Sequence, residues 1–435
     1  MRISALRLKH LPPFEDVMME FPKKSDASIG EVQIITGQNG TGKTRLLCAM
    51  ASILGNPKNL QIRIADTPNV EFGAVVEFFE KTYLVWGLDG LCGTIERGNS
   101  TQQFQQFDPK KPQLHLETQF RLIRQVSKSS NQPSSALAFR GTAKVNDAKV
   151  EAMKPIPIGD FANNLDFEAN DQSTFILQAM TNLKMAAAME FLSKQDGETN
   201  PKSRSIQITS RLEGAVSKVS GKTFSFEVVP HPELRIRVRW GGVQMSFGAL
   251  PDGLRSIIGW LVACASRMAV EFPENESPLD IPVVLLVDEP ETHLHPAWQQ
   301  RLIPAAQILL PNSQIFVVTH SPFIISSVNS GFVHVLSEQE GKISVSEPME
   351  CSKGDTWVDA VEDALGLKTW YDPETETMLA DFRKLRQDVL SENGDIGTLQ
   401  SLAGEISSRS ESLSQMMGRE MYQLRQIIEG TTARR

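Results

Sequence analysis

The sequence predicts an α/β fold in which helices flank a mixed sheet, extended by an inserted helical arm and a C-terminal helical tail. Three observations predict it. A glycine-rich octapeptide, Gly37–Thr44, stands between a β-branched segment and an apolar helix. Two later apolar runs, 283–287 and 315–318, are typical of buried parallel strands. From about residue 352 the composition shifts to long side chains that favour helices.

The composition is that of a globular chain. Of the 435 residues, 40% are hydrophobic and 22% are charged, which gives room for about two or three domains. The four cysteines have no short repeated spacing, so we expect neither a disulfide framework nor a cysteine zinc site. The net charge of −8 excludes a globally basic nucleic-acid coat and leaves room only for a local basic patch.

Membrane and targeting segments are not expected. The most apolar stretch, 257–269, is interrupted by Arg267 and is too short to span a bilayer. The N-terminal residues lack the apolar core of a secretory signal, so the mature chain is expected to begin here. We therefore predict a cytoplasmic protein without membrane contact.

The first hundred residues predict strands around one helix. Hydrophobic periodicity and β-branched content give these elements. They are an antiparallel hairpin (1–21), a short strand (32–35), an apolar helix (44–54) and two further strands (71–79 and 82–88). Residues 101–200 then turn polar, with a short strand at 136–139 and helical spacing over 171–194. We interpret 101–200 as an inserted arm or helical subdomain.

The remaining chain divides into a second sheet-forming part and a tail. Residues 201–345 predict strands at 223–229 and 234–238, a long helix at 254–270, and the two buried strands named above. Residues 346–435 predict a helical tail. Its helical patterns lie at 356–365, 375–390, 396–408 and 411–428.

The octapeptide Gly37-Gln38-Asn39-Gly40-Thr41-Gly42-Lys43-Thr44 matches the G-x-x-x-x-G-K-[ST] pattern in the strand-to-helix context that the pattern requires. Its backbone N–H groups can converge on phosphate oxygens at a helix N-terminus. Lys43 would add a charge near the terminal phosphate, and Thr44 would offer a hydroxyl to Mg²⁺. The alternative is a glycine-rich turn that matches by chance. The predicted nucleotide-binding residues are Gly37, Asn39, Gly40, Thr41, Gly42, Lys43 and Thr44.

The buried run 283–287 ends in two carboxylates, Asp288 and Glu289. Ligands bind at the carboxyl edge of a parallel sheet. We expect Asp288 to hold Mg²⁺ and Glu289 to orient and deprotonate the attacking water. A solvated acidic turn after a core strand is the plainer alternative.

Three of the seven histidines follow these two strands. His293 and His295 could bind zinc, but the sequence implies no further ligand, so a structural turn is preferred. His320 ends the run 315–318 and could hydrogen-bond the terminal phosphate or the attacking water. The alternative for His320 is a structural role at the edge of the core.

About 245 residues separate Lys43 from Asp288, so a large segment is inserted between them. This layout resembles the ABC-type ATPase heads of the SMC and overcoming-lysogenization-defect (OLD) superfamilies. The strings DEPETHLHP (288–296) and THSPF (319–323) resemble the OLD-like forms of the motifs. The resemblance covers about residues 1–345. It implies one P-loop ATPase head divided between 1–100 and 201–345, which binds ATP and Mg²⁺.

Such a head also has a signature motif that contacts the nucleotide of a partner subunit. Residues 250–256 are similar to it, except that Pro251 stands where the family usually has serine. Proline offers neither a hydroxyl nor an N–H, so the contact would come from Asp252, Gly253 or Arg255, from Ser256, or from the helix N-terminus. The Q-loop glutamine has only Gln125 and Gln132 as candidates. The resemblance implies that two heads enclose two nucleotides, in a homodimer or a higher multiple of it.

The tail resembles the short helical extension of stand-alone antiphage ATPases, such as the ATPase subunit of Septu systems. About 115 residues follow His320, and they are predicted to be helical, so we expect no TOPRIM nuclease domain within the chain. No histidine follows His334, which argues against an HNH site in the tail. The tail could instead be a structural or dimer-stabilising cap.

The predicted function is therefore an ATP-hydrolysing head that dimerises around ATP and controls a separate nuclease effector in antiphage defence. An HNH nuclease is favoured as that effector, and a TOPRIM protein is the second choice. The alternative is a structural DNA clamp, loader or repair ATPase with slow hydrolysis, whose basic segments Arg121–Lys128 and Arg235–Arg239 would contact DNA. The ATP subunit of a transporter is a third and weaker alternative.

Overall fold

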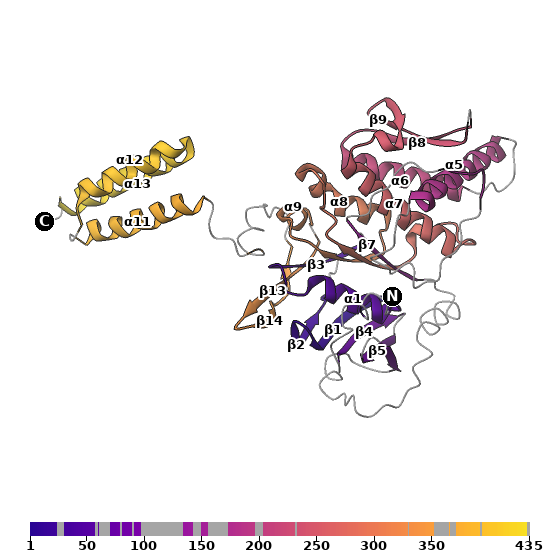
Figure 1. Cartoon of the computed structure of the whole chain (residues 1–435), viewed down its shortest axis with the longest axis horizontal. Coiled ribbons are helices and arrows are strands. Elements are labelled where there is room, and N and C mark those ends of the chain that lie inside the picture. Colours follow the sequence, from indigo (N-terminus) through magenta and orange to yellow (C-terminus); the bar gives the residue numbers. More distant parts are fainter. Residues whose placement is uncertain are drawn as a thin grey trace. The chain divides into compact units, whose positions relative to one another are not determined.

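The structure is a computed structural model. It describes residues 1–23, 30–56, 60, 70–78, 81–88, 91–96, 134–141, 149–154, 173–195, 203–230, 233–328, 330–351, 365, 371–391 and 394–432. The chain divides into two compact units, Met1–Leu365 and Gly366–Arg435 (Figure 1).

A mixed sheet lies at the centre of the first unit. Its strand order is β14-β13-β3-β12-β11-β7, and β15 also pairs with β13. The strands are β14 (Lys342–Val345), β13 (Gly331–Gln339), β3 (Glu31–Gly37), β12 (Ser313–Val318), β11 (Val283–Asp288), β7 (Ser135–Arg140) and β15 (Met349–Glu350). Neighbours from β13 to β7 are parallel, whereas β14 and β15 run antiparallel to β13. The predicted mixed sheet is confirmed.

Alternate residues of the central strands face two different cores. On β11, Val283, Leu285 and Val287 belong to one core, and Val284 and Leu286 belong to the other. Successive side chains of a strand point to opposite faces, so a strand covered on both faces has the continuous apolar run seen here. Because both faces of β11 are covered, its C-terminal end is held firmly in the core. Asp288 and Glu289 stand at that end.

Helices cover both faces of the central sheet (Figure 1). One core contains residues of α5 (Ser173–Gln195), α6 (Arg204–Ser220), α7 (Asp252–Glu271) and α8 (Pro296–Leu309). The other contains α1 (Lys43–Leu54) together with the N-terminal strands. Short helical turns are η2 (Phe247–Ala249), η3 (Pro278–Asp280) and α9 (Pro322–Ile325).

An antiparallel five-stranded sheet packs against α1. Its order is β2-β1-β4-β5-β6. The strands are β1 (Arg2–Leu11), β2 (Phe14–Glu20), β4 (Glu71–Phe78), β5 (Lys81–Leu88) and β6 (Leu91–Glu96). The side chain of Gln314 on β12 joins the two sheets, because it accepts from Ile3 N at 2.7 Å and donates to Ile3 O at 2.8 Å. The predicted N-terminal hairpin is confirmed as β1 and β2.

Several elements differ from the sequence expectations. Strand β7 falls inside the range interpreted as an inserted arm, yet it pairs in parallel with β11. The strand itself was predicted at 136–139, but its polar flanks led to its assignment to the arm, whereas its residues Ser135–Phe139 are all buried in the central sheet. Helices α6 and α8 and strand β10 (Val243–Ser246) were not expected. Strand β10 completes a three-stranded antiparallel sheet with β9 (Arg235–Trp240) and β8 (Phe224–Val229).

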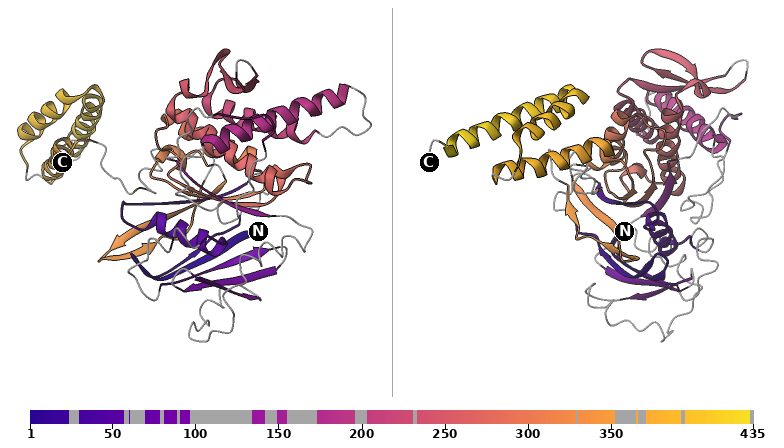
Figure 2. Two further views of the ribbon diagram at one scale, coloured as in Figure 1. Left: turned by 45° about the vertical axis from the view of Figure 1, so that its right-hand side comes forward. Right: turned by 60° about the vertical axis from the view of Figure 1, so that its left-hand side comes forward.

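The described residues of the second unit form three helices with a core of their own (Figure 2). They are α11 (Pro373–Leu390), α12 (Ile396–Arg409) and α13 (Glu411–Thr432). Asp372 and Asp395 are the N-caps of α11 and α12, because their side chains accept from backbone N–H groups of the first helical turn. The last three predicted helices are confirmed, and the first, at 356–365, lies almost wholly outside the described residues.

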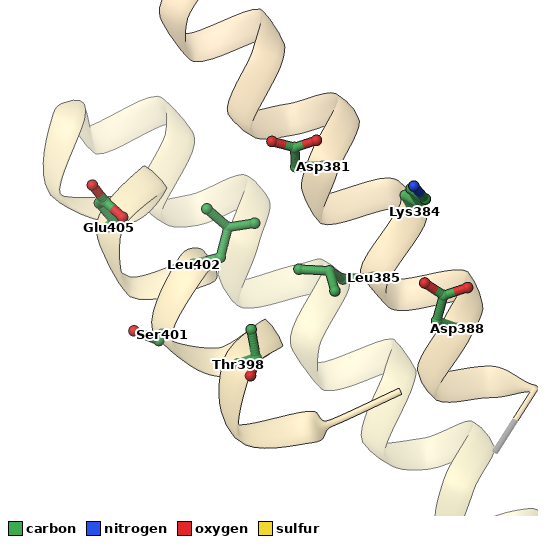
Figure 3. A pocket seen from close by; sticks show the side chains of 8 residues that line it. All are labelled: Asp381, Lys384, Leu385, Asp388, Thr398, Ser401, Leu402 and Glu405. Carbon is green, nitrogen blue, oxygen red and sulfur yellow. The ribbon is translucent and has the colours of Figure 1, made fainter. Parts of the chain in front are cut away.

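A hollow between α11 and α12 is the pocket drawn in Figure 3. Leu385 and Leu402 lie among polar and charged side chains around it. The other lining residues are Asp381, Lys384, Asp388, Thr398, Ser401 and Glu405. The hollow opens on the surface of the tail unit.

Among the described residues, one helix is long and apolar enough to cross a membrane, namely α7. However, 83% of its most apolar window is buried inside the fold, and core helices commonly pass the same test.

Candidate nucleotide-binding site

The phosphate loop connects the end of β3 to the start of α1, as predicted. Gly42 precedes α1 with a left-handed backbone (φ +89°), and a Cβ there would lie 2.7 Å from the side chains of Phe14 and Pro13. Gly40 also has a positive φ of +88°. Glycine adopts these angles without steric cost, so the loop can turn its backbone toward a ligand.

Lys43 is held inside the loop. Its Nζ donates to Gly37 O at 2.9 Å and to Gln38 O at 2.7 Å. Burial lowers the pKa of Lys43, and the nearby carboxylates of Glu289 and Asp288 oppose that shift. The ammonium is therefore pre-positioned among carbonyl dipoles and two acidic groups, where an incoming phosphate would be an additional anionic partner.

Thr44 and Asp288 meet across the site, although about 245 residues separate the phosphate loop from the end of β11. The Thr44 hydroxyl Oγ1 lies 3.3 Å from each carboxylate oxygen of Asp288. Asp288 is fully buried. A hydroxyl and a carboxylate are the hard oxygen donors that Mg²⁺ prefers, so these residues fit the ion. Among the described residues there is no group of three His, Cys, Asp or Glu side chains that could hold a metal; a Mg²⁺ site needs none, because phosphate and water complete it.

Glu289 leaves the strand with a left-handed backbone (φ +49°), and its N–H donates to Val318 O at 2.9 Å. Burial lowers the pKa of both Lys43 and His320, and the carboxylate of Glu289 opposes both shifts, so the three groups lie within electrostatic range. A positive φ is unusual for a residue other than glycine, and such residues concentrate at functional sites. The structure thus brings the predicted base and the phosphate loop together.

His320 follows β12 and has a lowered pKa, chiefly because of burial and then because of Lys43. The ring is therefore neutral near pH 7 and can both donate and accept a hydrogen bond. Its backbone N–H donates to Glu291 Oε1 at 2.8 Å, and the hydroxyl of Thr319 donates to the same oxygen at 2.8 Å.

Glu291 was not singled out from the sequence. Burial raises the pKa of its carboxyl, and the nearby Glu289 acts in the same direction. Its Oε1 accepts from the Thr319–His320 segment, while its Oε2 is buried without a hydrogen-bond partner. The side chain thus joins the segment after β11 to the segment after β12. The available signal was its place three residues beyond Asp288, in the same short acidic string.

The two other histidines after β11 lie in a turn. His293 has a φ of +63°, and His295 Nδ1 accepts from Ala297 N at 3.2 Å as the N-cap of α8. This geometry supports the structural-turn interpretation.

The predicted signature segment begins α7. Pro251 is the N-cap and makes no side-chain cap hydrogen bond, and the exposed Asp252 pairs with Arg255. A Cβ on Gly253 would lie 2.7 Å from His293 O, so the helix start packs closely on the turn after β11. Ser256 is buried, and its hydroxyl donates to Gly141 O at 2.8 Å. Ser256 is therefore buried and occupied within the chain, whereas Asp252 is exposed and pairs with Arg255.

Arg140 is a second residue that sequence reasoning missed. It ends β7 directly opposite Asp288 in the strand register, and its Nε lies 3.6 Å from Asp288 Oδ2. Recognising Arg140 would have required knowing that β7 adjoins β11.

The two Q-loop candidates, Gln125 and Gln132, lie outside the described residues.

A family model matches residues 95–326, slightly more than half of the chain. Its description is "AAA domain, putative AbiEii toxin, Type IV TA system". The matched range contains Asp288, Glu289 and His320, and it begins after the phosphate loop.

The chain is also similar to curated relatives. It is 27% identical over 236 residues to the Retron Vc95 probable ATPase of Vibrio cholerae serotype O1 biovar El Tor, covering 52% of this chain and 44% of that protein. It is 23% identical over 180 residues to the Septu protein PtuA of Bacillus thuringiensis, covering 40% and 43%. The chain thus spans less than half the length of either relative. The predicted resemblance to Septu ATPase subunits is confirmed as a sequence similarity.

Among solved structures, an SMC head bound to the C-winged helix domain of ScpA aligns with 80% of this chain and 98% of its own length. The sequence identity is 15%, and the TM-score is 0.46.

Proposed function

Because this chain belongs to the AAA-domain family whose model matches residues 95–326, we propose that it binds and hydrolyses ATP at the site formed by the phosphate loop and the ends of β11 and β12. The observation that best supports this is the meeting of Thr44 with Asp288 at 3.3 Å. It joins two motifs far apart in sequence into one oxygen-rich cation site beside a phosphate loop.

Each residue has a distinct role in this proposal. Backbone N–H groups of the loop and the Lys43 ammonium bind the phosphates of ATP. Thr44 and Asp288 hold Mg²⁺, which when bound offsets the negative charge on the phosphates. Glu289 orients the attacking water and accepts its proton. The neutral His320 donates a hydrogen bond to the terminal phosphate or the water.

The test measures the release of phosphate from ATP in the presence of Mg²⁺. It compares the purified native chain with the Glu289→Gln variant. Removing the base should lower turnover by about 100-fold or more while ATP still binds. Equal turnover in the two proteins would refute the assignment of Glu289.

We further propose that ATP joins two copies of the chain through the start of α7. Asp252, Gly253 and Arg255 lie at this helix start, where Pro251 provides no side-chain cap. A helix N-terminus favours an anion, so it can approach the terminal phosphate bound by the other copy. The names of the relatives, a retron probable ATPase and a Septu protein, support a role in antiphage defence.

In this proposal, the nucleotide state of the dimer controls a separate nuclease effector, of the HNH class before the TOPRIM class, in the cytoplasm. Co-purification with the product of a neighbouring nuclease gene, followed by mass measurement with and without ATP, tests it. A nuclease that neither binds the chain nor responds to its nucleotide would overturn this part.

One observation favours a second function, direct DNA contact. On β9, Arg235, Arg237 and Arg239 are all exposed and alternate with buried Ile236 and Val238. However, Arg235 pairs with Glu233 and Arg239 with Glu227, which reduces the local positive charge. DNA binding that weakens steeply with salt would support this function; no binding at low salt would refute it.

A further inference from the structure

Arg140 lies beside the residue proposed to hold Mg²⁺, and the site as described above gives it no role. It follows the buried part of β7, and its register partner across the sheet is Asp288. Its side chain is 34% exposed, whereas Asp288 is fully buried. The guanidinium Nε is buried without a hydrogen-bond partner and lies 3.6 Å from Asp288 Oδ2. The contact is thus an ion pair whose donor remains available for a closer acceptor.

The guanidinium and the proposed Mg²⁺ would share one carboxylate. Asp288 faces the Thr44 hydroxyl at 3.3 Å and Arg140 at 3.6 Å. A buried carboxylate is costly without a nearby cation, and Arg140 supplies one in the structure. A divalent ion between Thr44 and Asp288 would place a second cation beside the guanidinium, and the two would repel each other.

The backbone around Arg140 is fixed on both sides. Gly141 N donates to Asp288 O at 2.9 Å, and the Ser256 hydroxyl of α7 donates to Gly141 O at 2.8 Å. A Cβ on Gly141 would lie 1.9 Å from Glu289 O, so the segment has no room to shift toward β11. Any response of Arg140 to a new cation is therefore a rotation of its side chain about a stationary backbone.

We propose that Arg140 is a residue that distinguishes ATP from ADP, an inference that rests on the proposed function. Without nucleotide, its guanidinium neutralises Asp288. When Mg²⁺ and ATP bind, Asp288 turns to the ion, and the displaced guanidinium donates to oxygens of the terminal phosphate. Arginine suits this exchange, because its charge is permanent and its planar fork matches phosphate oxygens. ADP lacks the γ-phosphate, which is the terminal phosphate of ATP, so its binding gains nothing from Arg140.

The test compares Arg140→Gln and Arg140→Lys with the native chain, using calorimetric binding of ATP and of ADP at several Mg²⁺ concentrations. Arg383→Gln is the matched control, because Arg383 is an exposed arginine on α11 in the second unit. Relative to the native chain, we expect Arg140→Gln to bind ATP about tenfold more weakly, as loss of a charged hydrogen bond implies. Its affinity for ADP should change by less than about threefold. The same variant should need less Mg²⁺ for half-saturation with ADP, because no guanidinium competes for Asp288.

Arg140→Lys should lose part of the preference for ATP over ADP, since lysine keeps the positive charge but not the planar, forked guanidinium. If Arg140→Gln does not fold, Arg140→Lys by itself tests the proposal. Equal losses for ATP and ADP, or a Mg²⁺ requirement unchanged in both variants, would overturn the proposal. These outcomes differ from failure of the proposed function, in which the native chain itself would bind no ATP.

Discussion

At the phosphate-loop end of the site, the charged groups Lys43 and Asp288 are buried, whereas at the start of α7 Asp252 is exposed and pairs with Arg255 of the same helix. Lys43 binds two carbonyls of its own loop, and Asp288 contacts Thr44 and Arg140. This difference supports our proposal that one copy binds ATP and Mg²⁺ at the phosphate-loop end, while the exposed start of α7 contacts the nucleotide of a second copy.

The largest expected effect is at the phosphate-loop end of the site. Lys43→Ala removes the ammonium from a buried site in which two carboxylates remain, so ATP should bind at least about 100-fold more weakly. Equilibrium binding of a fluorescent ATP analogue measures this. Lys218→Ala, an exposed lysine in the last turn of α6, is the control. Native-like affinity in Lys43→Ala would show that the loop does not bind nucleotide.

Gly141→Ala should have the next largest effect. Its new Cβ would lie 1.9 Å from Glu289 O, which forces the proposed base to move. Because displacement of a catalytic group by about 1 Å can cost about 100-fold in rate, phosphate release should fall by about 10- to 100-fold with smaller changes in ATP binding. Gly214→Ala is the control, because no atom lies within 4 Å of a Cβ there. Unchanged phosphate release would contradict the position assigned to Glu289.

A third prediction concerns the start of α7 and the association of two copies. In Gly253→Ala the new Cβ would lie 2.7 Å from His293 O and would shift the start of α7. Overpacking of this kind costs about 1–3 kcal/mol, so ATP-dependent association of two copies should weaken by about tenfold, while each copy binds ATP normally. Analytical ultracentrifugation with and without ATP separates these effects. If Gly253→Ala instead lost ATP binding in the single chain, the two ends would not be distinct.

Glu291 gives the smallest expected effect. Glu291→Gln keeps an oxygen that can accept from Thr319 and His320 N, so turnover should stay within about threefold of native. Glu291→Ala removes that acceptor, and turnover should fall by about tenfold. Steady-state phosphate release measures both variants. A similar loss in the two would mean that the charge of Glu291, and not its hydrogen bonds, matters.

The parts of this site that the sequence predicted are those whose motifs are local. The phosphate loop, the acidic end of β11 and the histidine after β12 each stand in one short string, and the structure brings them together. Arg140 and Glu291 were missed because their roles depend on neighbours that are distant in sequence. Arg140 needs the pairing of β7 with β11, and Glu291 needs the meeting of the segments after β11 and β12.

The same reason explains the misplaced β7. A short strand between polar segments gives a weak periodic signal, and only its parallel partner shows that it belongs to the central sheet. By contrast, α11, α12 and α13 were predicted because each is long, and Asp372 and Asp395 mark where the first two begin.

The mass of Glu289→Gln in the presence of Mg²⁺ and ATP tests the central claim most directly. If hydrolysis needs Glu289 and the α7 end completes the site of a second copy, this variant should retain ATP and have twice the 48.3 kDa mass of the chain, or a multiple of that. Removing ATP, or combining the change with Lys43→Ala, should return the lower mass. A Glu289→Gln chain that binds ATP tightly and keeps an unchanged mass at every ATP concentration would contradict the account.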